Sequence, residues 1–173
     1  MTAMAQCDFK IEKFSPSDFE LYFALVQNID VMQMITERAL SYEEAQAAFT
    51  QLISNNQMHS AFGNFKILDS ETHDFIGLAK LEIDQPNSST AELGYMLLPQ
   101  YWGKGIATKV AQNLIHLAQS QNVLNHLIAI IDPVNIPSRK ILINNGFYSK
   151  GFKAFDGLAG ELLELKLDQA VQA

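Results

Sequence analysis

A turn with two glycines and a lysine, in the stretch QYWGKGIATKV, separates a predicted strand from a predicted helix. Gly103 and Gly105 leave backbone N–H groups uncovered, and the first four N–H groups of a helix have no internal partner. Together with the helix dipole, these donors favour an anion, most naturally a phosphate. A tight turn with no ligand is the alternative. The predicted binding segment consists of Gly103, Lys104, Gly105, Ile106, Ala107 and Thr108.

The spacing of the glycines excludes two familiar phosphate loops. The GxxxxGK pattern of a Walker loop is absent, and GxGxxG fails because Thr108 stands three residues after Gly105. The context still supports a ligand, since open α/β sheets bind ligands beyond the carboxyl ends of their strands. Asn135 and Ser138 follow the next predicted strand at the matching end. Either of these two residues could instead only cap or begin a helix.

Hydrophobic periodicity predicts the elements that must position these residues. Helices are predicted after the capping sequence at residues 15–18 and after the capping box at residues 41–44. The other predicted elements are strands over 9–13, 61–69, 75–84, 91–99 and 126–132, helices from 106 and over 135–144, and two closing strands before 168. The strand over 126–132 is nearly all apolar, as in parallel pairing, so one βαβ unit and a mixed α/β (α+β) fold are predicted.

Composition and charge limit the classes of partner. The 173 residues are 48% hydrophobic, which suits one globular domain with a sizeable core. The net charge is −7 without a basic stripe, which argues against nucleic acid and favours a cationic or amine partner. No apolar run approaches the roughly 20 residues of a membrane span, so no membrane partner is expected. Cys7 is the only cysteine, and a cytoplasmic location is predicted.

Other polar and flexible residues give weaker signals. The four histidines (His59, His73, His116 and His126) show no metal-ligand spacing, so no metal is predicted. A second group, Met32, Met34 and Ile35, lies between two predicted helices. These three residues either line an acceptor groove, where methionine tolerates varied ligands, or fill the core.

The segments AELGYMLLPQYWGKGIATKV and NIPSRKILINNGF resemble the GNAT superfamily of N-acetyltransferases. Within it they resemble the Rim-type branch, which includes the acetyltransferases of ribosomal-protein N-termini. The specific match covers roughly Glu92 to Phe147. The resemblance implies a twisted mixed sheet of about seven strands with helices on both faces, whose parallel fourth and fifth strands splay apart to admit acetyl-CoA. It also implies a single acetyltransferase domain over residues 1–173, with an ordered core at 8–168.

The family's phosphate loop reads Gln/Arg-x-x-Gly-x-Gly/Ala, and this chain offers two registers. Gln100-x-x-Gly103-x-Gly105 satisfies the letters, whereas a register that starts at Trp102 fits the spacing from Pro99 to the helix. We prefer the second, which places Trp102 where the family has Gln or Arg. The phosphate contact from that side chain is then lost, while the backbone donors remain. For the Trp102 side chain, packing is favoured over a role as a lid.

The resemblance also assigns roles on the reaction path. Asn135 matches the residue that contacts the pantetheine arm of the cofactor, and Glu92 matches a position that supplies a base in several members. Many members carry a tyrosine where this chain has Leu142. Ser138, in the Asn-x-x-Ser segment that Rim-type enzymes share, therefore becomes the candidate acid for the leaving thiolate. The alternative for Glu92 is a charged residue at a solvated strand edge.

The chemistry requires a neutral amine that attacks a thioester directly. An α-amino group with a pKa near 7.7–8.0 is about a tenth neutral at pH 7, whereas a lysine near 10.4 is almost wholly protonated. A carboxylate such as Glu92, directly or through water, would remove the proton. A free backbone N–H near Leu97 or Leu98 would stabilise the oxyanion if the two strands splay.

The predicted function is acetyl-CoA-dependent transfer of an acetyl group to a primary amine by a monomer or homodimer. The acceptor stays open between a protein N-terminus, a polyamine, an amino acid and an amine antibiotic. A non-catalytic acyl-CoA-binding sensor domain is the alternative from another class.

Overall fold

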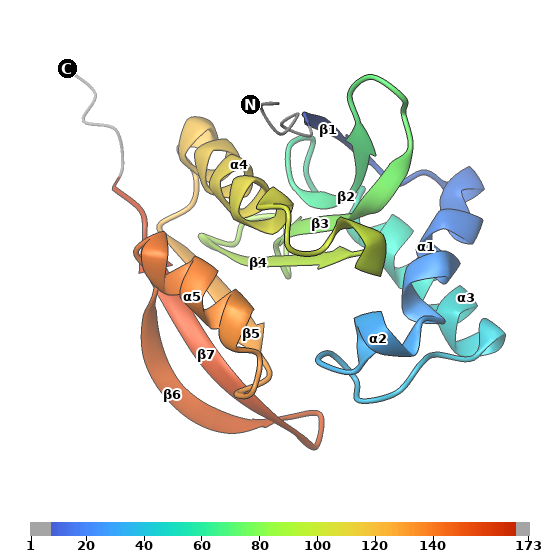
Figure 1. The fold of residues 1–173 in the computed structure, drawn as a ribbon. Coiled ribbons are helices and arrows are strands. Elements are labelled where there is room, and N and C mark those ends of the chain that lie inside the picture. Colours follow the sequence, from blue (N-terminus) through green and yellow to red (C-terminus); the bar gives the residue numbers. More distant parts are fainter. Residues whose placement is uncertain (1–7, 169–173) are drawn as a thin grey trace, which may run out of the picture.

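A seven-stranded sheet forms the centre of the computed structural model, which describes residues 8–168 (Figure 1). The strands are β1 Phe9–Lys13, β2 Gly63–Asp69, β3 Phe75–Glu82, β4 Thr90–Leu97, β5 His126–Ile131, β6 Tyr148–Phe155 and β7 Leu158–Lys166. They lie in the order β1-β2-β3-β4-β5-β7-β6, and every neighbouring pair is antiparallel except β4 and β5. The predicted mixed sheet is confirmed. The lone cysteine, Cys7, lies outside the described residues.

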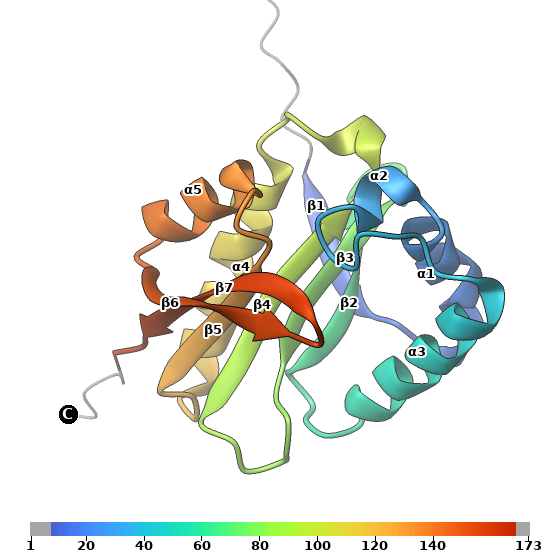
Figure 2. The same ribbon diagram turned by 90° about the horizontal axis from the view of Figure 1, so that it is seen from below.

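Helices cover both faces of the sheet. They are α1 Phe19–Val26, α2 Ile29–Met32, α3 Tyr42–Asn55, α4 Ile106–Gln121 and α5 Ile136–Asn144, with short 3-10 turns at Pro16–Asp18 and Pro99–Tyr101. Figure 2 shows α1, α2 and α3 together on one side and α4 and α5 on the other. The short helix α2 is absent from the sequence prediction. Within residues 8–168, no helix is both long and apolar enough to cross a membrane.

The two sides of the sheet carry separate hydrophobic clusters. On one face Val110 and Leu114 of α4 pack against Leu93 of β4, and all three are buried. On the other face Phe49 of α3 packs with Leu78 of β3. Each buried apolar side chain of this size contributes about 1.5–3 kcal/mol. Strand β4 is therefore held from both sides, and its odd-numbered and even-numbered residues face different layers.

The parallel pairing of β4 with β5 is short. It joins Thr90 to His126, Ala91 to Leu127 and Glu92 to Ile128, and it ends there. Beyond that point β4 continues along β3 as far as the pair Gly77–Leu97. Strand β5 continues along β7 as far as the pair Ile131–Glu161. The carboxyl end of β4 therefore has an edge without a strand partner on the β5 side.

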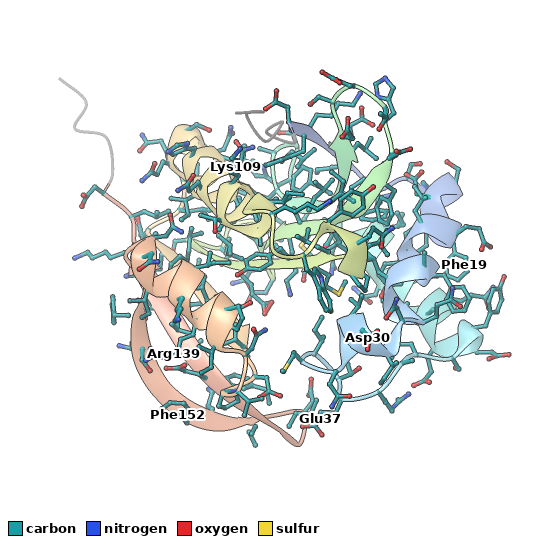
Figure 3. All side chains as sticks on the ribbon, viewed as in Figure 1. Phe19, Asp30, Glu37, Lys109, Arg139 and Phe152 are labelled. Atoms are coloured by element: carbon teal, nitrogen blue, oxygen red, sulfur yellow. The ribbon has the colours of Figure 1, made fainter. Side chains whose placement is uncertain are left out.

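A buried ion pair ties α5 to the sheet. The Glu161 side chain on β7 is fully buried, and Arg139 Nε of α5 lies 3.0 and 3.4 Å from its two carboxylate oxygens. Figure 3 labels Arg139 on α5. Because α5 also carries Ser138 and begins after Asn135, the pair holds both of these residues against the sheet.

Arg139→Ala should destabilise the fold by leaving the buried Glu161 carboxylate without its partner. We expect a loss of about 2–3 kcal/mol in the free energy of unfolding, below the usual cost of breaking a buried pair, because Arg139 is itself partly exposed. Denaturant titration measures the loss. The exposed pair Arg38–Glu44 provides the control, and Arg38→Ala should cost much less. Equal losses in the two variants would contradict the assignment.

Candidate active site

A groove of about 670 Å³ runs from the end of β4 past the first turn of α4 to the start of α5. The predicted cofactor residues that line it are Leu97, Trp102, Gly103, Gly105, Ile106, Ala107, Thr108, Asn135 and Ser138. Helix α2 and the segment after it close the opposite side, where Asp30 lines the groove (Figure 3). Leu98 and Lys104 are predicted cofactor residues that do not line it. Residues that are more than 100 positions apart in the sequence thus form one site.

The glycine turn opens onto the groove through its backbone. Gly103 and Gly105 have φ angles of +73° and +77°, a left-handed conformation that L side chains rarely adopt. A Cβ atom on either glycine would meet nothing within 4 Å, so the surface of the turn is uncovered. The Ile106 side chain, in contrast, is only 2% exposed and anchors the start of α4 in the core. The backbone of the two glycines is therefore free to face a ligand.

The start of α4 lacks the side-chain cap that α2, α3 and α5 have. In α3, Ser41 Oγ accepts the Glu44 N–H at 3.2 Å, as the capping box predicts. In α5, Asn135 Oδ1 accepts the Ser138 N–H at 3.3 Å. The N-cap of α4 is Gly105, which has no side-chain oxygen to offer. The first N–H groups of α4 thus meet the groove uncapped, which is the usual arrangement for binding an anion.

Two side chains beside the turn differ from expectation. Trp102 does not pack into the core, because its side chain is 48% exposed and its Nε1 donates to the Leu97 carbonyl at 2.9 Å. The Lys104 ammonium lies 5.8 Å from the centroid of the ring of Tyr101, a residue that lines the groove, and is within reach of a cation–π contact with it. The favoured interpretation of Trp102 as packing is therefore wrong. This indole instead covers a backbone carbonyl at the end of β4.

The free edge of β4 contains one of the two predicted oxyanion donors. The Leu98 N–H donates to the Ile76 carbonyl at 2.9 Å, so of the two alternatives Leu98 is excluded as the free donor. Successive N–H groups of a strand point to opposite edges, so the Leu97 N–H points away from β3. It faces the side on which pairing with β5 has already ended. Of the two candidates, only Leu97 presents its N–H to the gap.

A second hollow of about 250 Å³ lies on the other side of this gap. It is lined by residues of the α1–α3 layer, including Tyr22 and Leu52, and by Lys80 of β3. The residues common to the groove and this hollow are Met34, Ile35, Tyr95, Met96, Asn135 and Ser138. The two spaces therefore meet beside β4. Of the three residues expected at an acceptor groove, Met34 and Ile35 line both spaces, whereas Met32 is buried in the core.

Glu92 forms an ion pair within the sheet surface. Its Oε2 lies 2.7 Å from Lys80 Nζ, and both side chains are more than two-thirds covered. The even-numbered residues of β4 face the α1–α3 layer. Glu92 therefore lies on the same side as the second hollow, although it does not line that hollow. Glu92 is thus not simply a solvated residue at a strand edge. Any proton transfer to it from the hollow requires an intervening water.

The odd-numbered residues of β4 face α4, and they include a tyrosine that the sequence prediction missed. Tyr95 lines both spaces, and its hydroxyl oxygen is buried without a hydrogen-bond partner in the described part of the chain. Burial raises the pKa of Tyr95 above its usual value of 10.0, and the nearby Ser138 hydroxyl partly opposes this shift without reaching hydrogen-bonding geometry. The alternation of Leu93, Tyr95 and Leu97 was the available signal. Among residues 8–168, no three His, Cys, Asp or Glu side chains gather in a way that could hold a metal ion.

Comparisons with known proteins agree with this arrangement. "Uncharacterized N-acetyltransferase p20" of Bacillus licheniformis is 29% identical over 116 residues, which cover 66% of this chain and 65% of that relative. The spermidine N-acetyltransferase of Vibrio cholerae, solved in complex with CoA and spermine, has a TM-score of 0.77 at 18% identity, covering 93% and 96% of the two chains. The ribosomal-protein-S5-alanine acetyltransferase of Vibrio fischeri has a TM-score of 0.72 at 21% identity, covering 92% and 93%.

A protein-family comparison covers most of the sequence. The model of the acetyltransferase (GNAT) domain matches residues 8–148, which include β1 to β5, the glycine turn and the start of α5. The matched segment contains every residue discussed above as part of the groove. This chain belongs to the GNAT acetyltransferase family.

Proposed function

We propose that this chain is an acetyl-CoA-dependent N-acetyltransferase, acting through one acetyltransferase domain on a primary amine. The observation that carries the proposal is the uncapped start of α4, which opens onto a groove that continues to the free edge of β4. A phosphate-bearing ligand with a long arm fits such a site, because its anionic end and its reacting end are served by different elements.

Each part of the groove has a role toward acetyl-CoA. The backbone of Gly103 to Thr108 would hold the pyrophosphate, whereas the Asn135 side chain and the Leu97 edge would hold the pantetheine arm. When bound, acetyl-CoA supplies the activated acetyl group. The Leu97 N–H then stabilises the charge that develops on the acetyl oxygen. The Trp102 Nε1–H donates to the Leu97 carbonyl, which therefore has a hydrogen-bond partner at the opening.

The proton leaves the amine on the α1–α3 side of β4. Glu92 is the proposed base there and acts through a water, with Lys80 holding its carboxylate in place at 2.7 Å. Ser138, in the first turn of α5, lines both spaces and is proposed to assist protonation of the leaving sulfur. Its capping contact is through its backbone N–H, which leaves the hydroxyl available.

The second hollow favours an α-amine over a polyamine. Its described lining includes no Asp or Glu, and its one charged side chain is the cation Lys80. A chain of several ammonium groups would find no counter-ion there. An N-terminal α-amine carries a single charge and is about a tenth neutral at pH 7. This supports a Rim-type acceptor, a protein or peptide N-terminus; the structural likeness to a spermidine acetyltransferase concerns the fold alone.

An acceptor panel tests the reaction and its substrate class together. Steady release of thiol from acetyl-CoA should occur with N-terminal peptides and be weaker with spermidine or internal-lysine peptides. Mass spectrometry of the products should place the acetyl group on the α-nitrogen. Binding of CoA without thiol release from any amine would instead favour a non-catalytic sensor. Faster acetylation of internal lysine would contradict the α-amine preference.

Gly105→Val should weaken CoA binding by at least tenfold, or about 1.4 kcal/mol, because the new side chain projects from the anion-binding turn. Isothermal titration measures this change. Gly157→Val is a matched control, since Gly157 also has a left-handed φ of +81° and open surroundings but lies in the β6–β7 turn. Both variants should lose similar stability from backbone strain. Unchanged CoA affinity in a folded Gly105→Val protein would exclude the phosphate-binding turn.

Glu92→Gln keeps the shape of the side chain but removes the proton acceptor. The rate at neutral pH should fall by ~10²–10⁴ and recover as the pH approaches the pKa of the amine. CoA affinity should stay the same. Lys80→Gln breaks the same ion pair but keeps the carboxylate, so it should lose far less rate. Identical pH–rate profiles for wild type and Glu92→Gln would leave positioning and the Leu97 N–H as the main contributions.

A further inference from the structure

The Tyr95 hydroxyl is a buried polar group that the fold leaves unsatisfied. It is the one side-chain polar atom of the described residues that is fully buried without a hydrogen-bond partner. Such a group destabilises the fold if nothing replaces its lost water. Its position shows where a partner would come from, because Tyr95 lines both the groove and the second hollow. A ligand that passes between these two spaces contacts the Tyr95 side chain, which carries this hydroxyl.

The backbone explains why the hydroxyl is left unpaired. Tyr95 lies three residues beyond the last parallel pair, Glu92–Ile128, where β4 is no longer paired with β5. Its side chain has the parity of Leu93 and Leu97, which face α4 and its cluster. The neighbouring side chain from α5 is Leu142, which is apolar and only 1% exposed. Helix α5 thus offers the Ser138 hydroxyl nearby and no other hydroxyl at this point.

Glu92 and Tyr95 lie on opposite faces of the same strand. The even-numbered residues of β4 share a face with Leu78 in the α1–α3 cluster, and the odd-numbered residues share a face with the α4 cluster. A thioester held at the free edge of β4 would have its carbonyl approached from the Glu92 side. Its sulfur would then leave toward the side that carries Tyr95 and Ser138. Base and acid are separated by the strand itself.

We propose that Tyr95 is the catalytic acid of the transfer, donating its phenolic proton to the departing sulfur of coenzyme A. The amine nitrogen forms the new bond to the acetyl carbon, and the carbon–sulfur bond breaks. The sulfur takes the electron pair of that bond and the Tyr95 proton. The proton lost by the amine passes to solvent through Glu92. The phenolate regains a proton from solvent when coenzyme A leaves the groove.

This inference rests on the proposed function, since it needs coenzyme A in the groove. Tyr95→Phe keeps the ring that packs against the core and removes only the hydroxyl. The protein without ligand should be as stable as wild type or more so, because an unsatisfied polar group disappears. Turnover with the best amine should fall by ~10- to 100-fold, with kcat carrying most of the loss and the KM of the amine little changed.

A binding cycle tests the sulfur contact without any acceptor. CoA and desulfo-CoA, which lacks the sulfur, are titrated into wild type and Tyr95→Phe at pH 9, where much of the free thiol is ionised. Wild type should prefer CoA, and the variant should lose about 3- to 10-fold of that preference, the size of one net hydrogen bond. Tyr148→Phe is the control, because Tyr148 is an exposed tyrosine on β6 outside both spaces.

The outcomes separate the two proposals. If neither ligand binds wild type, the proposed function fails, and the role of Tyr95 fails with it. If CoA binds but Tyr95→Phe alters neither turnover nor the preference for CoA, the hydroxyl is a packing feature and only the inference is overturned. Lower turnover with an unchanged preference would also overturn it, because a structural defect and not a sulfur contact would then explain the loss.

Discussion

The early end of the parallel pairing between β4 and β5 is the constraint on which the site depends. Only three residue pairs join the two strands before each follows a different neighbour, β3 for β4 and β7 for β5. Beyond these pairs each strand stays paired on its other edge only, β4 with β3 as far as Leu97 and β5 with β7 as far as Ile131. The gap is therefore part of the folded state: it leaves the Leu97 edge without a strand partner, and Tyr95 lines the two spaces beside it.

The helices add polarity to this gap. Three of them begin with side-chain caps, at Asn28, Ser41 and Asn135, whereas α4 begins at Gly105 and keeps its first N–H groups for the groove. The resulting cost to α4 is offset by its buried face, which includes Ile106 and Leu114 in the core. The α1–α3 layer supplies the second hollow, and the Arg139–Glu161 pair fixes the start of α5. The proposed binding groups thus lie on helices and strands whose opposite faces pack into the core.

The sequence predicted the elements whose signals are local. Capping boxes, alternating strands and the glycine turn depend on neighbouring residues, and the structure places them as expected, with Ser41 and Gly105 as clear cases. Strand β7 lies between β5 and β6, and no local pattern specifies this order. Helix α2 is only four residues long and depends on the cap at Asn28. Neither the strand order nor a helix this short produces a periodic hydrophobic pattern, so periodicity could not predict them.

Part of the site could also be predicted from local signals. Backbone donors near Gly103 follow from residue type, and the groove contains them. The sequence did not predict that Trp102 Nε1 donates to the Leu97 carbonyl, nor that the Leu98 N–H, and not that of Leu97, pairs with Ile76. Both hydrogen bonds depend on how the chain folds in three dimensions. Tyr95 was missed because tyrosine in an apolar strand reads as core. Its significance appears only when the hydroxyl is found buried between two spaces without a partner.

In the proposed function, the uncapped turn and the free edge of β4 form one binding surface for coenzyme A. Because this surface consists of N–H groups, backbone amide NMR during titration with CoA can detect it. We expect large shifts for the amides of Gly103 to Thr108 and of Leu97, while Leu98, bonded to Ile76, changes little. Saturable shifts confined to other parts of the sheet, with the turn and Leu97 unaffected, would contradict it.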